Sequence, residues 1–122
     1  MRKLLFLITF VFCAGSSRAQ EIYRKTFGKP GDTPVIFLHG GPGGSAIDFE
    51  LTTAEKLAGK GFFVIVYDRR GEGRSDDDKA EFTFEQTFND LKDIYKDYGL
   101  GSAALLGHSF GGVVGARFAA QN

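Results

Sequence analysis

The feature that most restricts the possible folds is Gly107–Gly111 (GHSFG), a G-x-S-x-G pattern near the C-terminal end of the sequence. The uncharged segment 103–106 before it has the composition of a buried parallel strand, and segment 113–120 is predicted to form a helix packed on that strand. A strand that turns at once into a helix brings two backbones close together, which explains the glycine on each side. Ser109 is then held on a strained turn with its hydroxyl exposed, as a serine nucleophile would be. A Gly-rich turn with an incidental serine is the alternative.

The first 19 residues have the layout of a secretory signal peptide. Two basic residues precede an uncharged apolar run over 4–14, and small residues stand one and three positions before a predicted cleavage after Ala19. This run is shorter than the ~20 residues that span a bilayer. The sequence therefore predicts a secreted or periplasmic protein with no membrane attachment after cleavage. A lipid anchor at Cys13 is disfavoured, because Phe12 is bulky where such signals have a small residue.

Residues 20–122 are expected to form part of a single globular domain. The whole chain has 15 basic and 15 acidic side chains and no basic patch, so its composition gives no indication of nucleic-acid binding. Removal of residues 1–19 would also remove the only cysteine. The mature domain would then have no disulfide, and packing alone would have to stabilise it. The oligomeric state is not indicated.

A second Gly-rich segment follows an earlier apolar run. Segment 34–38 is continuously apolar, as in a strand covered on both faces, and leads into His39–Ser45 (HGGPGGS). The backbone N–H groups of such a loop can bind a phosphate or the oxyanion of an acyl-transfer reaction. The phosphate interpretation lacks both common phosphate-loop patterns. An oxyanion hole would combine the N–H of Phe110, after the serine, with one from this loop, for which Gly41 is the candidate. A purely structural turn is the third possibility.

The other segments alternate between strand and helix. The expected elements are an edge strand over 22–27, a helix capped by Ser45, a buried strand over 62–67, and a helix capped by Thr83 with Gln86. The first helix is expected to place Ile47, Leu51, Ala54 and Ala58 on its apolar face. The second is expected to place on one face Phe84, Phe88, Leu91, Ile94 or Tyr95, and Tyr98. This order predicts an α/β fold with a mostly parallel sheet, right-handed crossovers and flanking helices.

The loop Asp68–Ser75 (DRRGEGRS) follows the strand over 62–67. Ligands of parallel sheets bind at this end of the strands. Asp68 and Arg70 are interpreted mainly as structural residues that tie this loop to the Gly-rich loop. Direct contact with a substrate is the alternative.

Three segments together resemble the N-terminal half of an α/β-hydrolase fold enzyme: 39–44 (HGGPGG), 68–75 (DRRGEGRS) and 107–112 (GHSFGG). Within that superfamily the first two are most similar to those of the proline iminopeptidases. Those enzymes often have tryptophan after the nucleophile, whereas this chain has Phe110 and no tryptophan, and GHSFGG also occurs among esterases of the fold.

The resemblance implies a serine hydrolase that acts on an ester or on an N-terminal peptide bond, without a metal or other cofactor. Ser109 would form the acyl-enzyme, and the N–H groups of Gly41 and Phe110 would bind the oxyanion. The residues expected to support these motifs are His39, Gly40, Gly43, Asp68, Arg70, Gly107 and Gly111.

The resemblance also implies that part of the catalytic machinery lies elsewhere. A serine needs a histidine base and a carboxylate, which in this fold follow the nucleophile in the order serine, acid, histidine. No Asp, Glu or His follows Ser109 here. His39 is expected to order its loop, and the side chain of His108 to point into the scaffold. Residues 20–122 are therefore expected to be the N-terminal part of an α/β-hydrolase domain, inactive alone, with an exposed sheet edge. A non-catalytic binding protein with the same scaffold is the alternative.

Overall fold

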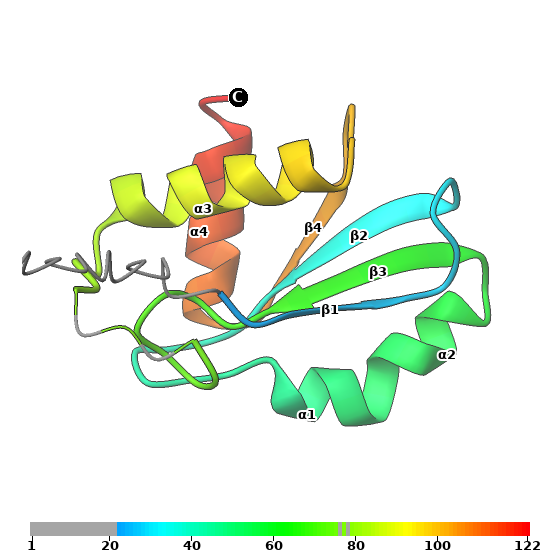
Figure 1. The fold of residues 1–122 in the computed structure, drawn as a ribbon, viewed down its shortest axis with the longest axis horizontal. Coiled ribbons are helices and arrows are strands. Elements are labelled where there is room, and N and C mark those ends of the chain that lie inside the picture. Colours follow the sequence, from blue (N-terminus) through cyan, green and yellow to red (C-terminus); the bar gives the residue numbers. More distant parts are fainter. Residues whose placement is uncertain (1–21, 76, 78) are drawn as a thin grey trace, which may run out of the picture.

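The structure, a computed structural model, describes residues 22–75, 77 and 79–122 (Figure 1). The predicted signal peptide, its cleavage after Ala19 and the alternative anchor at Cys13 all fall outside these residues. Among the helices of the described residues, none is long and apolar enough to cross a membrane.

Four strands form one mixed sheet in the order β1-β3-β2-β4. The strands are β1 (Arg24–Phe27), β2 (Thr33–Leu38), β3 (Phe62–Tyr67) and β4 (Ala104–Gly107). β2 pairs in parallel with both β3 and β4, whereas β1 pairs antiparallel with β3. The two continuously apolar strands, β2 and β3, lie at the centre, because only there are both faces of a strand covered. The predicted mostly parallel sheet with an N-terminal edge strand is confirmed.

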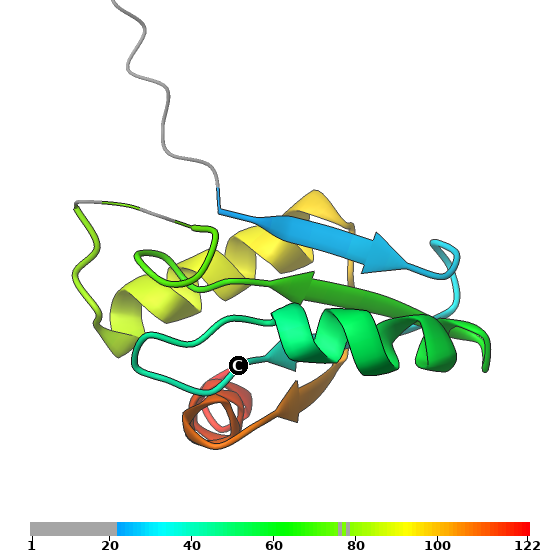
Figure 2. The same ribbon diagram turned by 90° about the horizontal axis from the view of Figure 1, so that it is seen from below.

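Helices cover both faces of the sheet (Figures 1 and 2). Helices α3 (Phe84–Asp97) and α4 (Phe110–Ala119) lie on one face, and the helical segment 47–58 lies on the other. The core on the first face includes Ile36, Leu38, Ile65, Tyr67, Leu91, Ile94, Val114 and Phe118. The core on the second face is built from Phe37, Ala46, Ala54, Val64 and Val66. Alternate side chains of the same strands thus enter two separate cores.

The helical segment 47–58 differs from the prediction. It consists of α1 (Ile47–Phe49), a π-helical turn (Glu50–Ala54) and α2 (Glu55–Ala58). Of the residues predicted to lie on the apolar face, Ile47 and Leu51 are 43% and 75% exposed and Ala58 is half-buried, whereas Ala54 is fully buried as predicted. The π turn changes the spacing of positions along the helix face, so the regular α-helical period does not apply. Ala54 and Ala46, the residue before the helix, pack into the core on this face of the sheet.

The predicted cap of this segment is also wrong. The N-cap position is Ala46, and no side chain of the helix caps it. Ser45 precedes that position, and its hydroxyl accepts only a long hydrogen bond, 3.4 Å, from the backbone N–H of Ile47. The backbone N–H of Ala46 instead donates to Asp68 Oδ1, 2.7 Å away, in the loop that follows β3. A distant carboxylate therefore stabilises the start of this helix, close to its positive end.

Helix α3 begins as predicted. The Thr83 hydroxyl accepts a hydrogen bond from the backbone N–H of Gln86 at 3.1 Å. The Gln86 side chain accepts from the backbone N–H of Glu81 rather than from that of Thr83. The residues predicted to lie on the inner face include Phe88, Leu91 and Ile94, and all three are buried. The apolar period of this helix was therefore a reliable guide to its packing.

Strand β4 lies at an edge of the described sheet and is more exposed than its apolar sequence alone indicates. Ala104 is exposed, Leu105 is half-buried and Leu106 is 42% exposed. The apolar sequence of this strand predicts burial, but within the described residues only β2 pairs with it. The predicted exposure of an apolar sheet edge is confirmed for this strand.

Candidate active site

Ser109 lies on a strained turn between β4 and α4. Its φ of 53° and ψ of −122° are values that residues with a side chain rarely adopt. A Cβ on Gly107 would lie 2.5 Å from the Cα of Gly112, and one on Gly111 would collide with the carbonyl oxygen of Leu38. Glycine is thus required on each side of the serine, because the backbones of strand, turn and helix are in contact. The predicted turn geometry is confirmed.

The Gly-rich loop His39–Ser45 lies against this turn. The backbone N–H of His108 donates to the carbonyl oxygen of Leu38 at 3.0 Å, just before the loop begins. A Cβ on Gly40 would lie 3.0 Å from Nδ1 of His108 and 3.3 Å from the Cβ of Ser109. The two segments that were expected to supply oxyanion donors therefore meet at the carboxyl ends of β2 and β4. His108 is exposed, so the expectation that its side chain is buried in the scaffold is wrong.

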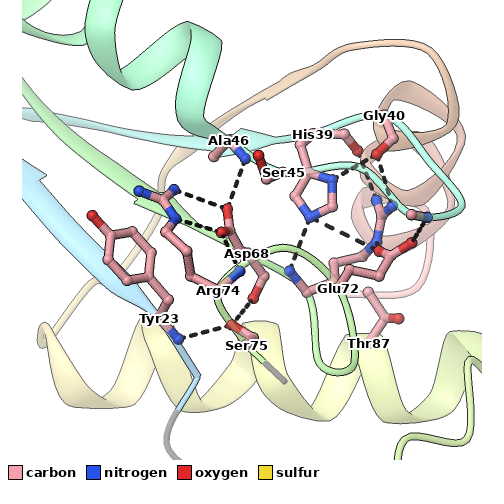
Figure 3. Close-up of polar contacts among 12 residues, drawn as sticks. Tyr23, His39, Gly40, Ser45, Ala46, Asp68, Glu72, Arg74, Ser75 and Thr87 are labelled. Carbon is pink, nitrogen blue, oxygen red and sulfur yellow. Dashed lines mark hydrogen bonds and ion pairs between the residues drawn. The ribbon is translucent and has the colours of Figure 1, made fainter. Parts of the chain in front are cut away.

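His39 is buried and both of its ring nitrogens are engaged (Figure 3). Nε2 accepts from the backbone N–H of Arg69 at 2.9 Å, so Nδ1 carries the proton and donates to the Gly40 carbonyl at 2.6 Å. Burial lowers the pKa of His39 below its usual 6.5, against the opposing effect of the bond to Gly40. The neutral ring joins the Gly-rich loop to Asp68–Ser75, and neither nitrogen is free to take a proton from Ser109.

Arg69 and Glu72 make further bonds between these two loops. The guanidinium of Arg69 donates to the carbonyl oxygens of His39 at 2.7 Å and Gly40 at 3.1 Å. Its Nε donates to Glu72 Oε2 at 2.6 Å, and Glu72 Oε1 accepts from the backbone N–H of Gly43 at 2.7 Å. Both residues are 6% exposed. The loop after β3 thus holds the Gly-rich loop at three backbone groups.

Arg70 points to different partners. It donates to Asp90 Oδ1 at 2.7 Å and to Asp77 Oδ2 at 3.0 Å, so it binds its own loop to helix α3. The prediction that Arg70 ties its loop to the Gly-rich loop is therefore wrong. Arg69, the neighbouring residue, makes those contacts instead. A loop has no regular period, so its sequence does not indicate which of two adjacent arginine side chains points toward the Gly-rich loop.

Asp68 does connect the two loops, through the residue that follows the Gly-rich segment. Besides Ala46, its carboxylate accepts from the backbone N–H of Arg74 at 2.9 Å and from its guanidinium at 2.7 and 3.1 Å (Figure 3). Burial alone would raise the pKa of Asp68, but the hydrogen bonds from Arg74 and Ala46 outweigh it and hold the pKa below the usual 3.8. Asp68 is therefore ionised at neutral pH.

Sequence reasoning missed Arg69, Glu72 and Asp90. One signal for Asp90 was available: it precedes Leu91 on α3, where a carboxylate close to the core requires a cation. For Arg69 and Glu72 the signal was that two residues of opposite charge stand three positions apart, so that they can form an ion pair, in a loop between two Gly-rich segments of the sequence. Neither signal identifies which groups of the Gly-rich loop or of the loop after β3 these side chains bind.

A pocket of about 220 Å³ opens beside the turn. Its walls include Pro42, which follows Gly41, and Phe110, which follows Ser109. Phe84 of α3 packs against Phe110, with ring centroids 5.7 Å apart. In the part of the chain that the structure describes, no group of His, Cys, Asp and Glu side chains is arranged to hold a metal ion.

Comparisons with known proteins agree with this architecture. A proline iminopeptidase of Saccharolobus solfataricus is 34% identical over 117 residues, which are 85% of this chain and 37% of that relative. The crystal structure of a proline iminopeptidase-related protein from Thermus thermophilus matches 82% of this chain and 36% of its own, with a TM-score of 0.75 and 30% identity. A crystal structure from work on carboxylesterases of Nitrososphaera gargenis has the same TM-score at 27% identity, covering 88% of this chain and 40% of that one.

The chain spans about a third of the length of the curated relatives it matches. The family described as alpha/beta hydrolase fold matches residues 33–122, which include all three motifs singled out in the sequence. The chain therefore belongs to the α/β-hydrolase fold family, with a proline iminopeptidase-like sequence.

Proposed function

We propose that this chain carries the nucleophile and the oxyanion site of an exported serine hydrolase that cleaves an ester bond or the bond after an N-terminal residue. The observation that carries the proposal is the backbone of Ser109, strained at a φ of 53° on a turn packed against the Gly-rich loop. A structure keeps such strain only where the surroundings enforce it, and such sites are commonly functional. The family and the similarity to peptidases and to an esterase structure support the same chemistry.

The proposed reaction has two steps. The Ser109 hydroxyl attacks the carbonyl carbon and gives its proton to a histidine, and the N–H groups of Gly41 and Phe110 bind the oxyanion. The tetrahedral intermediate collapses with loss of an alcohol or amine, which takes the proton, and leaves an ester on Ser109. Water then hydrolyses this ester, with the same histidine acting as base.

The histidine and its carboxylate are proposed to lie in the remainder of the full-length protein, by which we mean the whole gene product that contains this sequence. His39 cannot serve, because Nε2 and Nδ1 are both used to hold backbone groups. The chain alone is accordingly proposed to be inactive.

The pocket beside Phe110 suggests the kind of group that the site accepts. A dry cavity of about 150 Å³ can hold benzene, so 220 Å³ is enough for a small ring or branched chain. Its charged residues already have partners: Arg69 is paired with Glu72, and Arg70 with Asp77 and Asp90. An uncharged, apolar substituent next to the scissile carbonyl is therefore proposed.

Labelling with a fluorophosphonate tests the nucleophile. The full-length protein should be labelled at Ser109, and Ser109→Ala should lose the label. Ser102→Ala, which alters an exposed serine before β4, should keep it. A folded wild-type protein that is not labelled would contradict the proposal and favour a binding protein with the same scaffold. A label retained in Ser109→Ala would show that another residue is the nucleophile.

A further inference from the structure

We infer that Arg69 and Glu72 are positioning residues for the oxyanion site: a buried ion pair that fixes the direction of the Gly41 N–H. This inference rests on the proposed function and adds to it two residues that the motifs do not identify. Neither side chain is placed to react, because both are almost fully buried and bonded to each other at 2.6 Å. Their effect has to pass through the backbone of the Gly-rich loop.

The bond to Gly40 bears directly on the proposed donor. The carbonyl of Gly40 and the N–H of Gly41 belong to the same peptide unit, which is planar. A hydrogen bond from Arg69 Nη2 to that carbonyl, at 3.1 Å, therefore also sets the direction of the Gly41 N–H, which points the opposite way within the same plane. The bond from Nη1 to the His39 carbonyl, at 2.7 Å, fixes the preceding peptide unit as well.

Glu72 holds the loop on the other side of Gly41. Its Oε1 accepts from the backbone N–H of Gly43 at 2.7 Å, while Oε2 accepts from Arg69. Figure 3 shows the Glu72 carboxylate and the Gly40 carbonyl on the same side of the loop. The Gly40–Gly41 peptide unit and the Pro42–Gly43 unit, two further along the loop, are thus bound to one ion pair, which restricts the rotation of the Gly41 N–H between them.

Arg69 also contacts the residue that would supply the second donor. Its guanidinium carbon lies 5.2 Å from the ring centroid of Phe110, within the range of a cation–π contact. A Cβ on Gly41 would collide with Arg69 Nη2 and lie 2.9 Å from Glu72 Oε1. One side chain therefore touches both Gly41 and Phe110, and it explains why position 41 is glycine.

The chemistry of the pair suits this role. A guanidinium presents several N–H groups in a rigid plane and can serve three acceptors at once, whereas the ammonium of lysine is a single flexible centre. A buried cation without a counter-charge would be costly, and Glu72 supplies that charge. Because the pair is neutral as a whole, its effect on the oxyanion comes from orientation of donors rather than from net charge.

The test compares Arg69→Gln, Arg69→Lys and wild type in the full-length protein. Loss of one oxyanion donor typically lowers kcat by a factor of about 10²–10³. A misdirected donor should approach the lower figure, so kcat of Arg69→Gln for a p-nitrophenyl ester should fall about 10²-fold, with KM changed less than about threefold. Affinity for an alkyl boronic acid, which forms a tetrahedral anion on a serine, should fall by a similar factor. Arg69→Lys should keep the charge but not the planar set of donors, so its kcat should stay below a tenth of the wild-type kcat.

Arg74→Gln is the matched control. Arg74 belongs to the same loop and is paired with Asp68 and Glu50, but it makes no bond to the Gly-rich loop. Its replacement should lower the melting temperature and leave kcat and boronate affinity unchanged. If Arg69→Gln does not fold, Glu72→Gln serves instead, because the amide oxygen can still accept from Gly43 while the amide nitrogen faces Arg69; kcat should fall at least fivefold.

The outcomes separate this inference from the proposed function. If the wild type is labelled at Ser109 and Arg69→Gln keeps its kcat and boronate affinity, the positioning role is wrong and the hydrolase proposal stands. An equal loss of kcat in Arg74→Gln would likewise overturn the positioning role, since a general loss of stability would explain both. A wild type that is neither labelled nor active refutes the proposed function, and the positioning role with it.

Discussion

Replacement of Asp68 by asparagine should lower the free energy of unfolding of the full-length protein by about 3 kcal/mol at pH 7. The fully buried carboxylate accepts four hydrogen bonds, from the backbone N–H groups of Ala46 and Arg74 and twice from the Arg74 guanidinium. Asparagine keeps one acceptor oxygen, so the bond to Ala46 can persist. Its NH₂ group would then face the N–H donors of Arg74.

The magnitude follows from how deeply the pair is buried. Removing one partner of a buried ion pair costs about 3–5 kcal/mol. The lower figure applies here, because the Arg74 side chain is 29% exposed and keeps its bond to Glu50. Combining Asp68→Asn with Arg74→Gln should therefore cost less than the sum of the two single changes, with an interaction energy of about 2 kcal/mol.

The effect should also depend on pH in a defined direction. The pKa of Asp68 is lower in the folded protein than its usual 3.8, so its ionised form stabilises the fold above that pH. This contribution is lost as the pH falls through the folded-state pKa. Urea unfolding followed by circular dichroism should show the difference between wild type and Asp68→Asn at pH 7, and a smaller difference below pH 3.8. A difference under about 1 kcal/mol at pH 7, or one that acidification does not reduce, would refute this reasoning.

Two further predictions concern the turn and the buried histidine. Gly111→Ala should cost at least about 3 kcal/mol or prevent folding, because its Cβ would meet the Leu38 carbonyl, whereas Gly101→Ala, with no atom within 4 Å of the new Cβ, should stay within about 0.5 kcal/mol in thermal unfolding. The pKa of His39 is lowered by burial, so the unfolded chain binds a proton first on acidification, and stability should decline as the pH falls below 6.5. His39→Gln should remove this part of the decline in urea titrations between about pH 5 and 7.5, and equal slopes for both proteins would argue against a buried neutral ring.

The elements with the strongest patterns could be predicted from the sequence. β2 and β3 are continuously apolar because each is covered on both faces, and α3 carries its apolar residues at a regular helical period. The G-x-S-x-G turn was predictable for a different reason. Gly107 lies against the backbone of Gly112, and Gly111 lies against that of Leu38, and neither contact leaves room for a Cβ.

The parts that could not be predicted depend on contacts between distant segments. Arg69 and Arg70 are adjacent and chemically identical, yet one bonds to the Gly-rich loop and the other to α3. In the segment 47–58, a regular α-helical period places Leu51 and Ala54 on the same apolar face, but a π turn without a sequence signature leaves Leu51 exposed while Ala54 is buried. The orientation of a polar side chain in a loop depends on the groups to which it hydrogen-bonds. The sequence does not indicate which groups these are.

The strand order has a consequence for when the site can form. β4 pairs with β2, so the chain must pass through β3 and α3 before it returns to complete this part of the sheet. Contacts between segments so far apart in sequence form slowly, since a long loop has to close first. During synthesis β1, β2 and β3 can associate before β4 emerges, because the N-terminal part of a chain leaves the ribosome first. The left-handed backbone of Ser109 has no support until Gly111 docks against Leu38, so the turn that holds Ser109 is among the last features of this region to be assembled.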